Sequence, residues 1–414
     1  MQATRGPENF DVIVVGAGPA GSTSAFFLAQ AGVSVLLLDR AVFPRDKPCG
    51  GGVTGRAARL LPFSIEPVVE DVVDRLEIGL SYARRFERQS EKPLIFMTRR
   101  VALDAFLVEK ACAAGAVFRD GTRVTEVELR ADDVIVKTKT WSGRAHALIG
   151  ADGANGITAR ALGCDGARVH LVALEGDLGY DSVDRDRYRG RAVLELGSVP
   201  GGYGWIFPKG DHVNAGVGGW ETEGPRLRSH LRELVEGHGL GEGSLENVRG
   251  YRLPLRGPGD LVANGRGLVV GDAAGLVDPL TGDGMYEAFL SARFASRAVV
   301  DLIQGRTEEL TPYADALLRS VGPLCVASWG GKRSFDRFPR LSYSLARTRR
   351  AWRVIAELLQ GGDPEAAPDD YPVPLFLTAV LAATAGGAGR PYLREFRALR
   401  REQNVDAVRP QLDS

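Results

Sequence analysis

Three glycines near the start of the chain have the spacing of a nucleotide-binding turn. Gly16, Gly18 and Gly21 form the pattern G-x-G-x-x-G directly after an apolar, strand-like run. Without side chains they permit a tight turn and the close approach of a pyrophosphate, and a helix that begins there offers free N–H groups to the phosphates. Asp39 follows Gly16 by 23 residues, where its carboxylate would accept hydrogen bonds from a ribose hydroxyl. This spacing predicts a dinucleotide site rather than a simple turn.

Cys49 is the candidate for proton chemistry. Glycines occupy the next three positions, 50 to 52. A free thiol titrates near pH about 8.5, so at neutral pH it is mostly protonated and able to donate. The glycines would let the loop pass close to a flat ligand. Cys49 is therefore predicted either to supply or relay a proton, or to be a small buried apolar residue that fits a glycine-rich loop.

An aromatic stripe occupies the segment YGWIFP. On a strand, Tyr203, Trp205 and Phe207 would point to one face, with Gly204 and Ile206 on the other. Such a wall binds a chain-like apolar ligand by burying surface at roughly 25 cal/mol per Å². The alternative is an ordinary core face. Residues 209–212 are predicted to form a hairpin turn, with His212 a turn residue rather than a catalyst.

A few regular elements must hold these residues in place. From Phe10 to Asp39 the pattern predicts strand, glycine turn, helix over 22–31 and a second strand. Further predictions are a helix over 101–114, a hairpin within 122–140 that breaks near residue 131, and a strand in ALIGADG. Residues 168–250 alternate like an antiparallel sheet, GRGLVV is a buried strand, and helices follow over 284–304 and beyond 308.

Composition excludes several classes of protein. Of 414 residues 44% are hydrophobic, and Lys+Arg and Asp+Glu both total 52, so no basic field favours nucleic acid. The four cysteines are widely spaced, so neither disulfides nor a metal site is expected and a cytoplasmic location fits best. The longest strongly apolar stretch, Leu375 to Ala385, is about half of the ~20 residues of a membrane span.

The segment 332–353 carries eight basic residues against one acid, Asp336, with aromatic residues interleaved. Charge runs are usually solvated helical faces, which is the favoured interpretation. Peripheral contact with the inner face of a membrane is the alternative.

Two further segments resemble the flavin motifs of the glutathione-reductase-type hydroxylases. GDAAGLVDPLTGDG resembles the second motif, which implies that Asp272 binds the ribityl chain and that the turn at Gly282 and Gly284 faces the flavin pyrimidine. A helix that begins near Met285 would stabilise the negative charge of reduced flavin there. The resemblance predicts FAD as the cofactor.

GADGANGITAR resembles the middle motif of the same group, which implies that Asp152 lies near the pyrophosphate; Gly156 stands where the group usually has serine. Arg100 matches an Arg-x-x-x-Asp helix start and would pair with the cofactor, the alternative being a surface arginine. The cofactor contacts predicted in full are Gly16, Gly18, Ala20, Gly21, Asp39, Arg40, Cys49, Gly50, Arg100, Val124, Asp152, Gly271, Asp272, Gly282, Gly284 and Met285.

Two segments resemble the geranylgeranyl reductase family in particular. KPCGGGVTGRA is similar to its cysteine-glycine loop, and YGWIFPKGDHVNAGVG fits its pattern Tyr-x-Trp-x-Phe-Pro, seven residues, Gly-x-Gly at every defined position. The resemblance implies saturation of C=C bonds in a long isoprenoid chain of a lipid, quinone or prenyl diphosphate. We hypothesise that Cys49 supplies or relays the proton for this reaction, the alternative being the small buried residue described above. The resemblance also implies substrate contacts from Tyr203, Trp205, Phe207, Pro208, Gly216 and Gly218.

The expected fold class is α/β, with a Rossmann-type FAD-binding domain, an inserted antiparallel substrate sheet and a helical C-terminal region. We assign 1–62, 95–167 and 251–307 to the FAD-binding domain, 63–94 and 168–250 to the substrate domain, and 308–414 to the C-terminal region. An apolar tunnel along the aromatic strand should lead to the flavin.

Two alternative functions share these motifs: a flavin monooxygenase or halogenase, and a non-catalytic prenyl carrier. A quinone-linked electron-transfer dehydrogenase is disfavoured, because the cysteines do not cluster as an iron–sulfur centre requires. No second G-x-G-x-x-G follows a strand, so the electron donor is external, with NAD(P)H, ferredoxin and a reduced quinone as candidates. The sequence predicts no oligomeric state.

Overall fold

The computed structural model describes residues 7–166, 168–241, 245–257 and 259–361. Structural statements below refer to these ranges. The predicted helical C-terminal region is covered as far as residue 361, and the apolar stretch from Leu375 to Ala385 lies outside the described residues.

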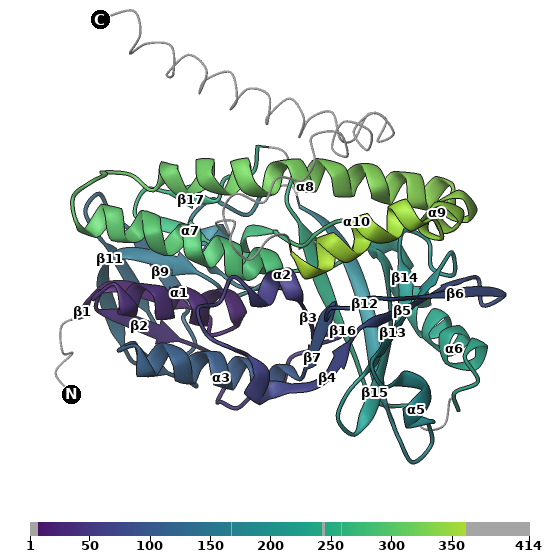
Figure 1. Ribbon diagram of the computed structural model, residues 1–414. Coiled ribbons are helices and arrows are strands. Elements are labelled where there is room, and N and C mark those ends of the chain that lie inside the picture. The colour runs from purple at the N-terminus through teal and green to yellow at the C-terminus, as the bar shows by residue number, and fades with distance from the viewer. Residues whose placement is uncertain (1–6, 167, 242–244, 258, 362–414) are drawn as a thin grey trace, which may run out of the picture.

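The first layer is an eight-stranded sheet that contains the glycine turn. Its order is β17-β18-β11-β1-β2-β8, and the hairpin β9–β10 extends from β11 (Figure 1). The central strands are parallel, and from residue 10 of β1 onward their paired residues are apolar, as expected for a sheet covered on both faces. The bounds are β1 Glu8–Val15, β2 Val35–Leu38, β8 Val117–Arg119, β9 Glu126–Leu129, β10 Val134–Lys137, β11 Ser142–Gly150, β17 Ala263–Asn264 and β18 Gly267–Val269.

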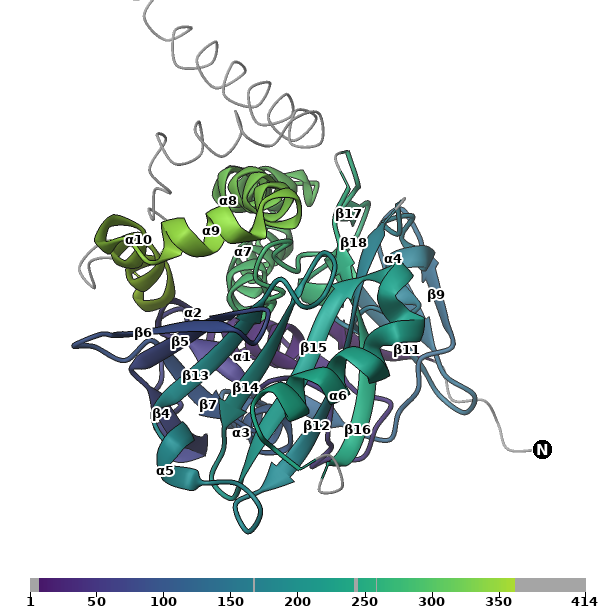
Figure 2. The same ribbon diagram turned by 90° about the vertical axis from the view of Figure 1, so that its right-hand side faces the viewer.

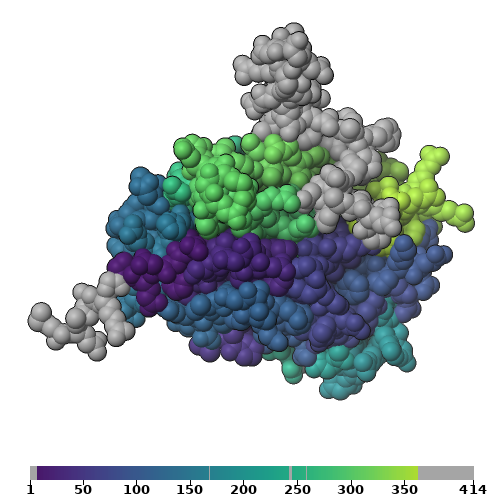
Figure 3. All heavy atoms as spheres, turned by 60° about the vertical axis from the view of Figure 1, so that its left-hand side comes forward, coloured from purple at the N-terminus to yellow at the C-terminus, as the bar shows by residue number. Residues whose placement is uncertain are grey.

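Three helices cover one side of this sheet. They are α1 Pro19–Gln30, α3 Arg100–Ala113 and α7 Met285–Ile303, and α1 packs against both of the others. In Figure 3 the purple N-terminal segment accordingly lies between the green and blue segments. The helix predicted from residue 22 begins earlier, at Pro19, because proline is well suited to a first helical position. The predicted ends of the other two helices agree within one or two residues.

The second layer is a seven-stranded sheet, ordered β16-β12-β15-β14-β13-β5-β6. All its neighbours are antiparallel except β13 and β5, which are parallel. Helix α6 Leu227–Gly237 covers one face (Figure 2). The bounds are β5 Arg75–Leu80, β6 Arg84–Gln89, β12 Val169–Gly179, β13 Arg191–Leu196, β14 Tyr203–Pro208, β15 His212–Trp220 and β16 Glu246–Leu255. The predicted fold class, a Rossmann-type domain with an inserted β-sheet, is confirmed.

A small sheet joins the two layers. Its strands are β3 Gly52–Thr54, β7 Ile95–Thr98 and β4 Val69–Val73 (Figure 1). Because β3 begins at the end of the glycine-rich loop after Cys49, that loop lies between the two large sheets. The predicted domain boundaries stay a prediction; the structure shows that β5 and β6 pair into the same sheet as β12 to β16.

The helices beyond residue 308 pack over the upper side of the molecule in Figure 1. They are α8 Thr311–Arg337, α9 Pro339–Ala346 and α10 Arg349–Gln360. Within the described residues, no helix combines the length and apolarity needed to cross a bilayer. The remaining short elements are α2 Gly55–Ala58, η1 Glu66–Val68, α4 Thr158–Ala161, α5 Arg185–Tyr188, η2 Glu221–Arg226 and η4 Gly271–Ala274.

Candidate active site

The glycine turn forms a cradle at the start of α1. Gly16 has φ +105°, and a Cβ there would lie 2.2 Å from the Ala151 carbonyl oxygen; at Gly21 it would lie 1.8 Å from the Gly16 carbonyl oxygen. Both positions therefore require glycine for the backbone itself. Gly18 differs, because its Cβ would meet only guanidinium nitrogens of Arg45 and Arg100, each at 3.7 Å. The space beside Gly18 thus faces two cations and an uncapped helix N-terminus, which fits a diphosphate.

Arg45 and Arg100 both pair with Asp104. Arg100 binds Asp104 through two 2.7 Å hydrogen bonds, and Arg45 Nη1 lies 2.8 Å from Asp104 Oδ2. Burial opposes the charge of Arg100, but Asp104 outweighs burial and raises the pKa. Arg100 is buried, so the surface-arginine alternative is wrong. Arg45 also lies 3.8 Å from Asp39 Oδ2. Both guanidinium groups border the space beside Gly18, where they could donate to a phosphate. Arg45 was missed by the sequence analysis.

Asp39 is held rigidly at the end of β2. Its two carboxylate oxygens accept hydrogen bonds from the Ala17 N–H (2.8 Å) and the Ala41 N–H (2.9 Å). Arg40 beside it is exposed, and Val124 is buried. The role of this carboxylate as an acceptor for a ribose hydroxyl stays a prediction.

Asp152 follows β11 and lies beside the glycine turn, because a Cβ on Gly16 would also lie 2.8 Å from its backbone nitrogen. Its side chain caps α4, accepting hydrogen bonds from Ile157 N–H (2.7 Å) and Thr158 N–H (3.0 Å). A Cβ at Gly156 would lie 2.0 Å from the Asp152 carboxyl carbon. The glycine at position 156, where the family usually has serine, therefore makes room for this cap. The role of Asp152 at the pyrophosphate stays a prediction.

The second flavin motif packs against the first. A Cβ at Gly271 would lie 3.0 Å from the Cβ of Ala20 in α1. Gly282 has φ +67°, as a glycine turn before α7 requires. Gly284 is the N-cap of α7 and has no side chain to cap it, but the Met285 N–H already donates to Asp283 Oδ1 at 2.8 Å. The Met285 N–H is therefore not free for the flavin in this arrangement.

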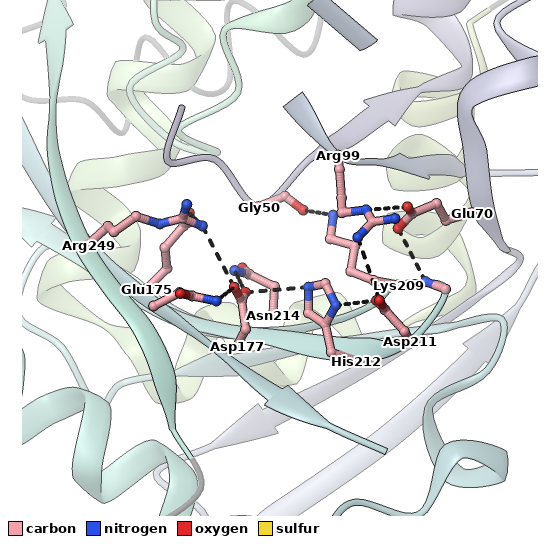
Figure 4. A network of polar contacts seen from close by, with 12 residues as sticks. Gly50, Glu70, Arg99, Glu175, Asp177, Lys209, Asp211, His212, Asn214 and Arg249 are labelled. Atoms are coloured by element: carbon pink, nitrogen blue, oxygen red, sulfur yellow. Dashed lines mark hydrogen bonds and ion pairs between the residues drawn. The ribbon is translucent and has the colours of Figure 1, made fainter. Parts of the chain in front are cut away.

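The loop that carries Cys49 is held from below by two charged residues (Figure 4). The Cys49 N–H donates to Glu175 Oε1 at 2.7 Å. Lys209 Nζ donates to the carbonyl oxygens of Gly50 (2.5 Å) and Thr98 (2.9 Å). Cys49 itself is half-buried and packs against the hydrophobic core. The structure thus fixes the loop backbone and leaves the thiol at the edge of the core.

Burial shifts the pKa values of Glu175 and Lys209 toward neutral pH. Burial raises the pKa of Glu175 to about 7, against the opposing effects of the Cys49 N–H and Lys209. Burial likewise lowers the pKa of Lys209 to about 8. The sequence analysis missed both residues. The available signals were an acid within the apolar run LVALEGDLG and a lysine directly after the aromatic strand.

Strand β14 places the aromatic stripe beside this loop. A Cβ at Gly50 would lie 3.0 Å from the Phe207 ring and 3.3 Å from Trp205 Nε1. At the other end, the Tyr203 hydroxyl donates to the Thr281 carbonyl in the second flavin motif. The aromatic residues therefore extend from the Cys49 loop to the flavin turn, as a substrate wall would require.

The pairing of β14 with β15 explains why seven residues separate the aromatic part of the family motif from its Gly-x-Gly part. Tyr203 pairs with Gly218, Trp205 with Gly216, and Pro208 with Val213. A Cβ at Gly216 would lie 2.1 Å from the Trp205 ring, so glycine is needed for the ring to lie across the neighbouring strand. The hairpin turn predicted at 209–212 is present and is closed by the hydrogen bond from the Lys209 N–H to the His212 carbonyl at 2.8 Å. His212 itself was predicted to be a turn residue, but it is the first residue of β15 and pairs with Gly179.

An apolar cavity lies between the second flavin motif and α8. Leu276, Val277, Leu317, Val321, Leu324 and Cys325 line it, together with the polar residues Asp278 and Glu287. No side chain of β14 lines this cavity. The predicted tunnel along the aromatic strand is therefore a different space and stays a prediction.

Comparison with known proteins agrees with this geometry. Residues 9–190 match the family model of the FAD binding domain. A digeranylgeranylglycerophospholipid reductase of Methanopyrus kandleri is 34% identical over 322 residues, covering 71% of this chain and 81% of that protein. A menaquinone reductase of Mycobacterium tuberculosis is 33% identical, covering 70% of this chain and 76% of that protein.

Two solved structures share the fold. A geranylgeranyl bacteriochlorophyll reductase-like protein from Thermoplasma acidophilum has a TM-score of 0.74 at 23% identity, covering 95% of this chain and 100% of that one. A flavin-dependent brominase has a TM-score of 0.69 at 18% identity, covering 91% and 98%. The fold and the nucleotide motifs define an FAD-dependent oxidoreductase. Within that class, the chain belongs to the geranylgeranyl reductase family.

Proposed function

We propose that this protein saturates C=C bonds in the long isoprenoid chain of a membrane lipid, quinone or prenyl diphosphate. The observation that carries the proposal is the convergence of three segments. The Cys49 loop meets the aromatic strand at Gly50, and the same strand reaches the second flavin motif through Tyr203. An isoprenoid chain along the strand would therefore run between the thiol and the flavin-binding turn.

Each group has a separate part in the proposed reaction. Bound FAD, once reduced, supplies the hydride. The Arg45–Arg100 pair and the α1 N-terminus would hold its diphosphate. The aromatic wall orients the apolar chain and excludes water, and Cys49 supplies the proton for the second carbon of the double bond. The electrons would come from NAD(P)H, ferredoxin or a reduced quinone.

The names of the relatives support a lipid-linked substrate, since one names a digeranylgeranyl lipid and the other a quinone. The halogenase alternative has weaker support, because the brominase shares the fold at only 18% identity. The two relatives named above, at 34% and 33% identity, are both named as reductases.

We also propose that the molecule docks on anionic membranes through a surface formed by residues 337–353. Lys332 does not contribute, because it is buried, donates to the Gly201 carbonyl and stacks on Trp220. On and beside α9, however, Phe338, Leu341 and Leu345 expose 53%, 56% and 56% of their surfaces. The arginines of the same segment are exposed, and residues 337–353 contain no acid. Apolar side chains within a cationic surface fit an anionic bilayer.

Reduction of a digeranylgeranyl phospholipid tests the proposal. The purified protein, loaded with FAD and reduced with dithionite, should yield a lipid that gains two hydrogen atoms per double bond by mass spectrometry. Incorporated oxygen would indicate a monooxygenase. Bound lipid that is never reduced, with FAD present, would indicate a carrier. A protein that cannot bind FAD would overturn the proposal.

A further inference from the structure

Glu175 is a buried carboxylic acid directly beneath Cys49. It lies in the middle of β12 and is wholly inaccessible to solvent. One oxygen, Oε1, accepts the hydrogen bond from the Cys49 backbone. The other, Oε2, is buried and has no hydrogen-bond partner within the described residues. An unpartnered carboxylate oxygen at such a site is costly unless the group carries a proton or meets a ligand.

The charges around Glu175 do not neutralise it directly. The ammonium group of Lys209 is used on the carbonyls of Gly50 and Thr98. Arg249 Nη2 is 3.9 Å from Glu175 Oε1, and its Nη1 pairs with Asp46. Asp177, Arg100 and the buried Tyr251 hydroxyl complete the titratable and charged surroundings. Burial therefore dominates, and Glu175 can hold a proton at neutral pH.

Figure 4 shows Glu175, Asp177, His212 and Asp211 in a row. Asp177 is two residues further along β12 and so on the same face of the strand, and Arg249 lies between the two carboxylates, 3.7 Å from Asp177. His212 Nε2 is 3.4 Å from Asp177 Oδ1, and His212 Nδ1 is 2.6 Å from Asp211 Oδ1. The Asp211 side chain is 67% exposed. Protons from solvent therefore have titratable sites at successive depths below the surface.

We propose that Glu175 returns a proton to Cys49 after each turnover and is itself reloaded from solvent past His212 and Asp177. This inference rests on the proposed function of Cys49. The thiol gives its proton to the alkene carbon and becomes a thiolate, and the carboxylic acid of Glu175 then protonates that thiolate. The resulting carboxylate takes a proton from the solvent side. Both electrons for the saturated bond arrive with the hydride from reduced FAD, so no further reductant is needed.

Alkylation of Cys49 tests this coupling without any turnover. The rate of iodoacetamide modification is measured against pH on the full-length FAD-loaded protein, and the Cys49 peptide is quantified by mass spectrometry. Ionised Glu175 disfavours the thiolate, so the wild-type profile should show an inflection near neutral pH. Glu175→Gln keeps the acceptor for the Cys49 N–H but removes the charge. It should abolish the inflection and speed alkylation at pH ~7.5 on the order of tenfold.

Two variants make the alkylation result specific. Glu175→Asp should retain the inflection, because it restores a titrating carboxyl group. Glu195→Gln changes another wholly buried glutamate, which lies on β13 and bonds His238 at 3.1 Å. It should leave the Cys49 profile unchanged, whereas superimposable profiles for wild type and Glu175→Gln would overturn the inference.

If Glu175→Gln does not fold, infrared titration of the wild type provides the test. The absorbance of protonated carboxylic acids should decrease between pH ~6 and pH ~8, and no decrease over this range would also overturn the inference. Failure of the two proposals can be told apart. If lipid reduction fails while the alkylation profiles behave as expected, only the reductase proposal falls. If reduction proceeds but the profiles superimpose, only the role of Glu175 falls.

Discussion

Lys47 Nζ lies 3.3 Å from Asp272 Oδ2, although the two residues are 225 positions apart in the chain. Lys47 belongs to the cysteine-glycine loop, and Asp272 to the second flavin motif. This pair fixes the two segments to one another at the place where the ribityl chain is predicted to bind.

Gly18→Ala should weaken FAD binding with little effect on folding. A Cβ there meets nothing closer than 3.7 Å, and its φ of −77° suits any residue, but it would enter the space that faces Arg45 and Arg100. We expect about tenfold weaker binding, or ~1.4 kcal/mol, by flavin fluorescence titration of the apoprotein. Gly224→Ala, where a Cβ meets nothing within 4 Å, is the control. Equal FAD affinities for the two variants would contradict binding of the FAD diphosphate beside Gly18.

Cys49→Ser should keep the yellow flavin and slow alkene reduction. A serine hydroxyl is a much weaker acid than a thiol, so loss of the proton donor should cost on the order of 100-fold in turnover. The measurement is lipid reduction followed by mass spectrometry, with flavin absorbance to verify loading. Cys112→Ser, at an exposed position on α3, is the matched control. Undiminished turnover would remove Cys49 from the mechanism.

Gly216→Ala should distort the aromatic wall, whereas Gly218→Ala should not. The new Cβ at 216 would lie 2.1 Å from the Trp205 ring, while at 218 the nearest atom is 3.5 Å away. Overpacking of this kind costs typically 1–3 kcal/mol, or roughly several degrees in Tm. Thermal unfolding with tryptophan fluorescence measures both effects. Similar Tm values for the two variants would show that the ring shifts without cost.

Glu175 should make the protein less stable as the pH rises from about 4.5 to 7. The folded-state pKa of about 7 exceeds the unfolded value of 4.5, so over this range the folded state binds more protons and stability falls with pH. Glu175→Gln should remove this decline, which amounts to at most ~3 kcal/mol. Urea unfolding at the two ends of the range measures it. Parallel pH dependence in wild type and variant would contradict the raised pKa.

Leu341→Ser with Leu345→Ser should reduce binding to vesicles that contain phosphatidylglycerol. Both side chains are more than half exposed within the cationic surface of residues 337–353, so each loses apolar contact with the bilayer. Flotation should show several-fold less bound protein. Leu261→Ser, at a 57% exposed position outside this surface, is the control. Wild-type binding that is equally strong on neutral phosphatidylcholine vesicles would contradict an electrostatic contribution.

Much of the fold could be predicted from local patterns. The glycine turn after β1, the hairpin β9–β10 and the turn before His212 depend on neighbouring residues, so their spacing carries the information. The start of α1 was predicted three residues too late, because the glycine pattern concealed that Pro19 already begins the helix.

The sequence by itself determined the class of cofactor and the elements that carry it, because turns, strands and helix starts follow from residues close together in the chain. Only the tertiary structure decided which charged groups surround the site. Glu175 lies 126 residues from Cys49, and Arg45 joins Arg100 through a shared Asp104. Such pairs arise where a loop, a helix and a strand from distant parts of the chain pack together, and no local spacing encodes the distance between their side chains.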